Sequence, residues 1–223
     1  MAPLPLLLAL APLAAAPSGE GRVVEEVVAV IQAAGAEPRV VTLTKLTEEA
    51  RIIMISRGAT EAALRPLDGP ALKATLDWYV DQTLLSEEAA RLKVFEVERA
   101  EAQAELDRFT KRFARPEEYA AFLAASDISE EDVLAVLRRM LRVQRYLDSR
   151  VAGAARARVS DAEVEAAWRE RRAEFGGLPL AQVREAVRAR LAEERIRADV
   201  KALLSDLRQR SEVRVLATFG AGE

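Results

Sequence analysis

The last strand-like segment of the chain places the strongest constraint on the fold. Residues 212–216 combine charged and β-branched side chains as a short strand does, and no other strand-like segment lies near them in the sequence. A lone strand leaves backbone N–H and C=O groups unpaired, so it must pair elsewhere. The candidates are two β-branched runs, 23–31 and 39–43, joined by a loop containing glycine and proline. The sequence therefore predicts a small β-sheet formed by an N-terminal hairpin and a C-terminal strand.

Between these strands the pattern is helical. Aromatic residues make up 5% of the chain, and 10 Gly and 9 Pro are few for its length of 223 residues; this composition favours helices over a sandwich or a barrel. Capping residues, first-turn prolines and apolar stripes at helical spacing mark the expected ends, and Thr44 is placed to cap the first helix. We predict a mainly α fold. The expected helices, caps included, cover residues 44–57, 70–92, 97–113, 117–125, 129–151, 160–175 and 179–211.

The N-terminus has the pattern of a secretory signal peptide. Residues 1–16 contain no charged side chain and carry an apolar run followed by three alanines. The run is far shorter than the roughly 20 apolar residues that cross a bilayer as a helix, and no later segment comes close. Pro17 disfavours cleavage directly before it, so cleavage after Ser18 is the alternative. We expect residues 1–18 to be the signal peptide, residues 19–223 to be a single soluble domain, and the location to be periplasmic; an ordinary disordered N-terminus is the other interpretation.

The composition removes most familiar active sites. The chain has no Cys and no His, which excludes thiol nucleophiles, zinc sites built from Cys or His, and Ser-His triads. It also lacks the Gly-x-x-x-x-Gly-Lys loop of ATP-driven P-loop proteins. Acidic clusters, such as Glu87-Glu88 and Glu130-Glu131-Asp132, are interpreted as solvated groups at helix starts. We therefore expect no catalytic site, no cofactor, no metal and no enzyme activity.

Charge is unevenly distributed, although 33 basic and 36 acidic residues leave a net charge of only −3. Segment 138–158 holds seven arginines and one aspartate, whereas segment 87–107 holds seven acidic and three basic residues. Exposed pairs contribute on the order of 0.5 kcal/mol each, so two faces that pair with their neighbours at little net energy are the simpler interpretation. A polarised surface for charged partners is the alternative. Nucleic acid is not an expected partner, because the overall charge and the predicted export disfavour it.

Four aromatic residues form two helical pairs. Phe109 and Phe113 are four residues apart on one expected helix, and Tyr119 and Phe122 are three apart on the next, so each pair lies on one face. Mutual packing of the two helices explains this spacing. If the helices are left uncovered, the same side chains form an apolar contact surface for another chain. Trp78, Tyr79 and Trp168 carry the same two interpretations.

Several stretches also occur in the order and spacing of a known family. They are residues 77–85 with 88–92, residues 138–147, and residues 159–164 leading to the Glu-Phe pair at 174–175. Together they resemble the SurA-type periplasmic chaperones, which are relatives of trigger factor, over nearly the whole mature chain. The resemblance implies a SurA N-domain-like helical chaperone core in which the C-terminal helix packs back on the N-terminal part.

One domain of that family is missing. In SurA-like foldases a parvulin prolyl isomerase usually lies between the Glu-Phe helix and the C-terminal helix, but here only residues 176–178 separate them. The resemblance therefore implies an ATP-independent holdase for unfolded polypeptides, such as outer-membrane protein precursors, without prolyl isomerase activity. Residues 96–126 are expected to form a helical arm that contacts peptide through its four aromatic side chains. A scaffold or assembly subunit of the cell envelope, binding one specific partner, is the alternative. The peptide-binding residues so expected are Phe109, Phe113, Tyr119 and Phe122.

Overall fold

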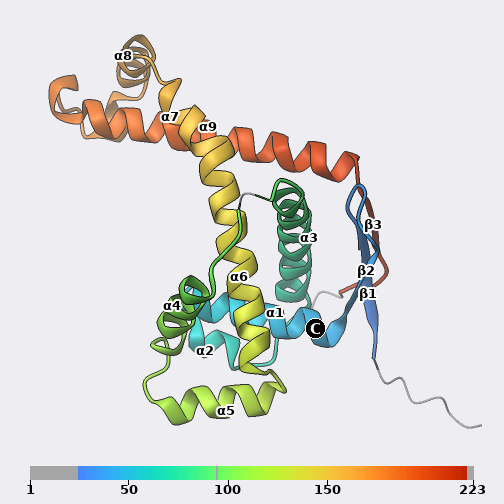
Figure 1. Ribbon diagram of the computed structural model, residues 1–223. Coiled ribbons are helices and arrows are strands. Elements are labelled where there is room, and N and C mark those ends of the chain that lie inside the picture. Colours follow the sequence, from blue (N-terminus) through green and yellow to red (C-terminus); the bar gives the residue numbers. More distant parts are fainter. Residues whose placement is uncertain (1–24, 94, 220–223) are drawn as a thin grey trace, which may run out of the picture.

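A computed structural model describes residues 25–93 and 95–219. The chain is mainly α-helical with one small antiparallel sheet, as predicted (Figure 1). The predicted signal peptide, residues 1–18, lies outside the described residues. None of the described helices is both long and apolar enough to cross a membrane.

The sheet joins the two ends of the described chain. Its strands are β1 (Val27–Gln32), β2 (Arg39–Thr42) and β3 (Glu212–Val215), in the order β2-β1-β3. β3 runs antiparallel to β1, with Val30 opposite Arg214, and the Leu216 N–H continues the pairing by donating to the Val28 carbonyl at 2.9 Å. The prediction that the last strand would pair with the N-terminal hairpin is confirmed.

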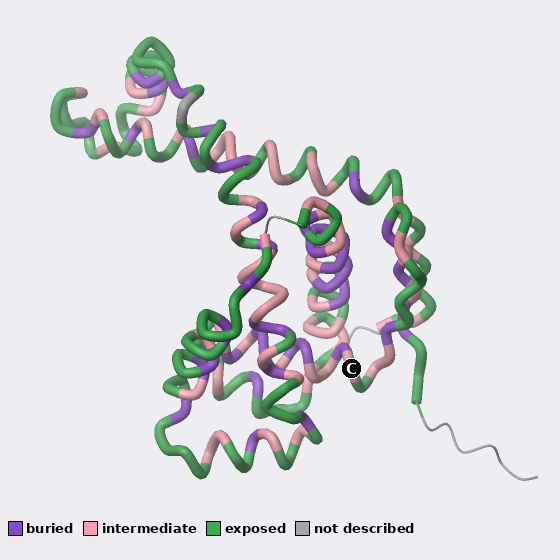
Figure 2. The backbone as a smooth tube through the Cα atoms, viewed as in Figure 1, coloured by how far each residue is buried: buried purple, intermediate pink, exposed green. Residues whose placement is uncertain are grey.

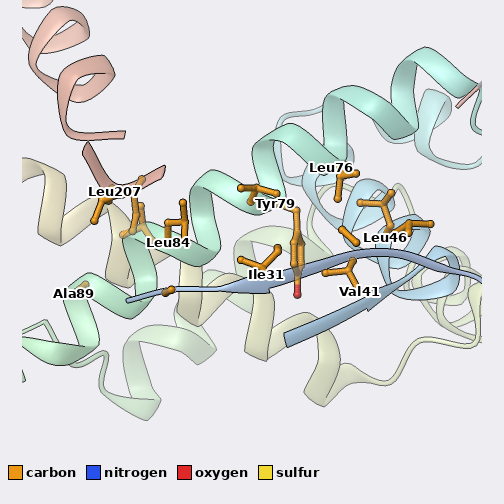
Figure 3. Close-up of a cluster of buried hydrophobic side chains, with 14 of the residues drawn as sticks. Ile31, Val41, Leu46, Leu76, Tyr79, Leu84, Ala89 and Leu207 are labelled. Atoms are coloured by element: carbon orange, nitrogen blue, oxygen red, sulfur yellow. The ribbon is translucent and has the colours of Figure 1, made fainter. Parts of the chain in front are cut away.

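One face of this sheet packs on the first core, which lies under helices α1 (Leu43–Ser56) and α3 (Gly69–Arg91). Asp68 caps α3 by accepting from the Ala71 N–H at 2.8 Å, and the predicted proline lies in its first turn. Figure 3 shows the side chains of the sheet and α3 meeting in this core. The buried residues of the first core are Val28, Ala29, Ile31, Ala33, Val41, Leu46, Leu76, Tyr79, Val80, Leu84, Leu85, Ala89, Val143, Tyr146 and Leu207.

The start of α1 differs from its prediction. Thr42, not Thr44, is the capping residue, and its Oγ1 accepts from the Lys45 N–H at 3.2 Å. Thr42 is also the last residue of β2, so strand passes into helix with no intervening loop. Two threonines two residues apart are equivalent caps in a sequence pattern; the pairing of β2 with β1 selects the first.

The second core is helical and lies at the other end of α1. It is enclosed by α1 with the short α2 (Thr60–Ala63), α4 (Arg99–Thr110), α5 (Pro116–Ser126) and α6 (Glu130–Leu147). A capping box begins α6, because Ser129 accepts from the Asp132 N–H and the Asp132 side chain accepts from the Ser129 N–H. The buried residues of the second core are Ile52, Ile55, Ala63, Leu106, Phe109, Phe113, Phe122, Ile128, Val133, Val136 and Leu137.

The helix that begins with α6 continues past its predicted end, but not as a regular α-helix. A π-helical segment, η1 (Asp148–Ala152), follows α6 and leads into α7 (Gly153–Ala157). This continuous rod carries the chain away from the two cores (Figure 1). A π-helical turn inserts one residue into the helical repeat, which rotates every later side chain about the helix axis.

A distal lobe lies at the end of this rod. It consists of α8 (Asp161–Glu170), the 3₁₀ turn η2 (Arg172–Phe175) and the first half of α9 (Leu180–Gln209), which together project from the body (Figure 1). α9 then crosses back to the sheet, where Leu207 is buried in the first core. The lobe has its own small core; its buried residues are Val159, Val164, Ala167, Val183, Val187 and Ala192.

Candidate functional site

The four aromatic residues expected to bind peptide lie together in the second core. The centroid of the Phe109 ring lies 6.0 Å from the ring centroid of Phe113, 6.2 Å from that of Tyr119 and 6.4 Å from that of Phe122. The exposed fractions of Phe109 and Phe122 are 2%, and that of Phe113 is 7%. The packing interpretation therefore describes this cluster, and its rings do not form an open contact surface.

Tyr119 is the one aromatic of this cluster with a surface-directed group. Its hydroxyl donates to Oε2 of Glu130 at 3.4 Å, which links α5 to the start of α6. Burial, with the Glu130 carboxylate beside it, raises the pKa of Tyr119 to about 12. The hydroxyl therefore stays protonated at any physiological pH and acts as a structural donor.

Segment 96–126, expected as a helical arm, packs against the body. The guanidinium of Arg145 on α6 pairs with Glu101 on α4, and its Nη1 donates to the Glu96 carbonyl at 2.6 Å. The part of the described chain that projects from the body is instead α7 with the distal lobe (Figure 1).

An apolar groove lies between the body and the returning half of α9. We call it the α3–α6–α9 groove, and its volume is about 410 Å³. Trp78 on α3, Met140 and Leu147 on α6, and Ile196 and Val200 on α9 are all half-buried and line it. Such a volume is in the range of pockets that hold several ligand groups. Half-buried apolar walls from three helices are the feature by which an apolar segment of another chain would be held.

The groove exists because three long helices converge at the rod. α3 supplies its floor at Trp78 and Gln82, and the end of α6 with the π-segment supplies one wall down to Ala152. α9 supplies the opposite wall and is attached to the rod by the ion pair of Asp199 with Arg158 on the loop after α7. The groove is therefore made by segments up to 143 residues apart, counted from Arg57 to Val200 in its lining.

Polar groups lie at defined points of the groove. The Arg57 guanidinium is 5.9 Å from the centroid of the Trp78 ring, which places a cation over an aromatic face at the rim. Gln144 and Asp148 are exposed there. Gln82 Oε1 is buried and has no hydrogen-bond partner among the described residues.

A buried ion pair fixes the helices beneath this region. Arg139 on α6 pairs with Glu49 on α1, whose side chain is 1% exposed, and the Arg139 guanidinium lies 5.2 Å from the Tyr79 ring centroid on α3. Removing either partner would leave an uncompensated buried charge. The pair therefore holds α1, α3 and α6 together, and two of these helices, α3 and α6, line the groove.

Three of the seven arginines in segment 138–158 form ion pairs among the described residues. Arg139, Arg145 and Arg158 pair with Glu49, Glu101 and Asp199, each on another part of the fold. Of these three pairs, Arg145–Glu101 alone joins the segment to the acidic segment 87–107. The simpler interpretation, that charged residues pair with their neighbours in the fold, describes these three arginines.

The acidic clusters have structural partners as well. Glu87 and Glu88 lie near the C-terminal end of α3, not at a helix start as expected. Glu87 accepts from Arg39 and Glu88 from Arg91, and hydrogen bonding from Arg91 lowers the pKa of Glu88. Glu130, Glu131 and Asp132 form the first turn of α6. Within residues 25–93 and 95–219 no group of three or more acidic side chains is arranged to hold a metal ion.

The sequence reasoning missed the groove residues on α9. Ile196 and Val200 are four residues apart, and Leu203 follows three residues later, so all three continue one helical stripe. That spacing was a usable signal for an apolar face. It does not distinguish a face that is covered, as at Leu207 in the first core, from one that stays half-open.

Comparison with known proteins adds no assignment to this geometry. No family model matches the chain, and a search of curated proteins finds no matching relative.

Proposed function

We propose that this protein is an ATP-independent chaperone of the SurA type that holds unfolded polypeptide, including outer-membrane protein precursors, without prolyl isomerase activity. The observation that carries the proposal is the α3–α6–α9 groove, whose half-buried apolar side chains remain open to solvent in the described part of the fold. The periplasmic location follows from the signal-peptide pattern of residues 1–18.

The composition of the groove suits a client without a fixed sequence. Met140 is flexible and polarizable, and the large apolar ring of Trp78, with Arg57 over one face, is not selective for one kind of apolar group. The polar groups are few and lie at the rim or floor, so they favour a backbone passing through rather than one particular side chain. Contacts of this kind are weak one by one, and a client held by them can leave and fold.

Aggregation of a chemically unfolded outer-membrane barrel protein, diluted without ATP, tests the proposal. We expect the purified protein to suppress light scattering at a near-stoichiometric ratio. The double variant Ile196→Ser/Val200→Ser removes the apolar wall of α9 and is expected to hold the client roughly tenfold more weakly. Circular dichroism should show that the variant retains its helix content.

The matched control changes two apolar residues outside the groove. Val40 and Leu64 are 56% and 53% exposed, and Val40→Ser/Leu64→Ser removes a similar amount of apolar side chain. We expect this variant to suppress aggregation as well as the unaltered protein does. Equal loss in both double variants would contradict the groove as the binding site. No suppression by the unaltered protein would reject the holdase and favour a scaffold that binds one partner, to be identified by pull-down from an envelope extract.

A further inference from the structure

The outer edge of β3 is open. In the described part of the chain β3 pairs with β1 on one side and with no strand on the other. The Leu216 N–H points toward β1, because it donates to the Val28 carbonyl. Backbone groups alternate sides along an antiparallel strand, so those of Val213 and Val215 point to the open edge. An open edge of this kind is a template for pairing with another strand.

Several of the devices that usually blunt an open edge are absent here, although β3 is short and two of its four residues are charged. β3 contains neither Pro nor Lys, and it pairs with β1 without a bulge between Glu212 and Val215. Val215 is 55% exposed and Leu216 58% exposed, although both are large apolar residues. A second strand along this edge would cover part of that apolar surface.

The order of charges on β3 favours one particular partner. Glu212 and Arg214 lie on the same face of the sheet and flank Val213, and Arg214 Nε donates to Glu212 Oε1 at 2.6 Å. When a second copy of β3 is placed antiparallel with Val213 opposite Val213, each Glu212 lies opposite the Arg214 of the other copy. Opposite charges across an antiparallel pair are favourable and like charges unfavourable.

The backbone agrees with the same register. In it the two Val213 residues exchange both of their N–H···O=C bonds, which requires that their groups point to the open edge, as they do here. The pair of Glu212 with Arg214 is then a non-hydrogen-bonded pair, the kind in which opposed side chains come closest. Centring the two-fold axis on Glu212 or on Arg214 would instead place like charges opposite each other.

The other edge of the sheet lacks this self-complementarity. β2 carries a single charged residue, Arg39, and that side chain is paired with Glu87 on α3. No antiparallel register of two β2 strands brings opposite charges together. The charge argument therefore selects β3 and not β2.

We propose that β3 pairs with β3 of a second copy of this chain, joining the two sheets into one of six strands around a two-fold axis. The interface is isologous, as expected of a symmetric dimer. Four residues at an edge bury little area, so the dimer is weak and its population depends on protein concentration. This inference does not depend on the proposed chaperone function, because the groove residues take no part in it.

Sedimentation equilibrium from about 10 μM to about 1 mM tests the dimer, a range that brackets weak association. We expect the unaltered protein to shift from monomer toward dimer as concentration rises. Glu212→Arg alone and Arg214→Glu alone each place like charges opposite each other, so each variant should self-associate at least about tenfold more weakly. An equimolar mixture of the two variants should associate as strongly as the unaltered protein, because every opposed pair is then of opposite charge.

A second variant tests the edge itself. Val213→Pro removes an N–H that points away from β1, so it should abolish dimerisation while circular dichroism shows that helix content is retained. Because the Val213 side chain packs against the first core, we expect a moderate fall in the temperature of thermal unfolding. An unaltered protein that remains monomeric to the highest concentration overturns the proposal. Dimerisation that the mixture of charge variants does not restore, or that survives Val213→Pro, also overturns it by assigning the contact to another surface. A Val213→Pro variant that loses client binding but shows no change in mass would assign the edge to the client instead.

Discussion

The rings of Phe113, Tyr119 and Phe122 surround the Phe109 side chain, with centroids 6.0–6.4 Å away. This packing joins α4 and α5, and contacts with Ile52 and Ile55 bring in α1. Phe109 lies on α4, Phe113 lies in the loop after it, and Tyr119 and Phe122 lie on α5, so the ring contacts link these segments. Their role at the residue scale is therefore to hold the second core together.

The substitution Phe109→Ala separates this role from direct client binding. It leaves a cavity in a closed core, so we expect the free energy of unfolding to fall by about 3–5 kcal/mol, measured by urea denaturation. The exposed Leu64→Ala serves as the control and should change it by about 0.5 kcal/mol or less. Under conditions where Phe109→Ala remains folded, it should suppress aggregation as well as the unaltered protein does. If the variant lost this suppression without losing stability, the aromatic cluster would be a client-binding site after all.

Local capping determines where several elements begin. The box at the start of α8 joins Ser160 and Glu163, and Arg195 on α9 pairs with the same carboxylate. Hydrogen bonds from the Ser160 backbone, from Arg195 and from the Ser160 hydroxyl lower the pKa of Glu163 to about 2. The carboxylate thus fixes both the start of α8 and its contact with α9.

The position of this pKa predicts a pH dependence of the distal lobe. Because the pKa of Glu163 falls from 4.5 to about 2 on folding, its ionised form stabilises the lobe above pH 4.5, and this contribution is lost as the pH falls toward about 2. Fluorescence of Trp168, followed in a Trp78→Phe background, reports on the lobe. Glu163→Gln should loosen the lobe already at neutral pH and flatten the pH dependence over this range. Identical acid transitions with and without Glu163 would contradict the assignment.

The molecule as a whole is built on cores of unequal size. The first core contains 15 buried residues and the second 11, whereas that of the distal lobe contains 6, all of them Val or Ala. Figure 2 shows buried positions concentrated in the body and sparse in the projecting lobe. Ion pairs from Arg184 and Arg188 to Asp161 supplement the small core, although exposed pairs of this kind contribute little.

The difference in core size predicts which parts of the molecule unfold locally first. Amide hydrogen exchange should show the lowest protection in α8 and the first half of α9, and the highest in α3 and α6, because local stability follows buried apolar contact. Ser160→Ala removes the α8 cap and should lower protection in the lobe by about 1 kcal/mol while leaving α3 unchanged. Uniform protection throughout the described chain would show that lobe and body open as one cooperative unit.

The elements were largely predictable because their signals are local. Ser129 with Asp132 and Ser160 with Glu163 bond within one turn, so the pattern alone locates both helix starts. The π-segment Asp148–Ala152 carries no comparable signal, since it contains neither Pro nor Gly to interrupt a helical pattern. The cap of α1 was misplaced by two residues because strand pairing, a long-range contact, decides between Thr42 and Thr44.

The groove was not predictable in the same way. Phe109 and Phe122 are the kind of residues expected at a binding surface, yet they are buried, whereas Ile196 and Val200 belong to an ordinary helical stripe and line the open groove. Exposure depends on which helices converge on a residue, and those helices lie far apart in the sequence.

By itself the sequence determined the helices, the hairpin and the partner of the last strand, because hydrogen bonding within a turn and the pairing of a lone strand leave few choices. The tertiary structure alone decided which apolar stripes are covered and which segment projects. Burial is the sum of contacts from distant parts of the chain, so identical helical patterns became a closed core around Phe109 and a half-open groove beside Ile196.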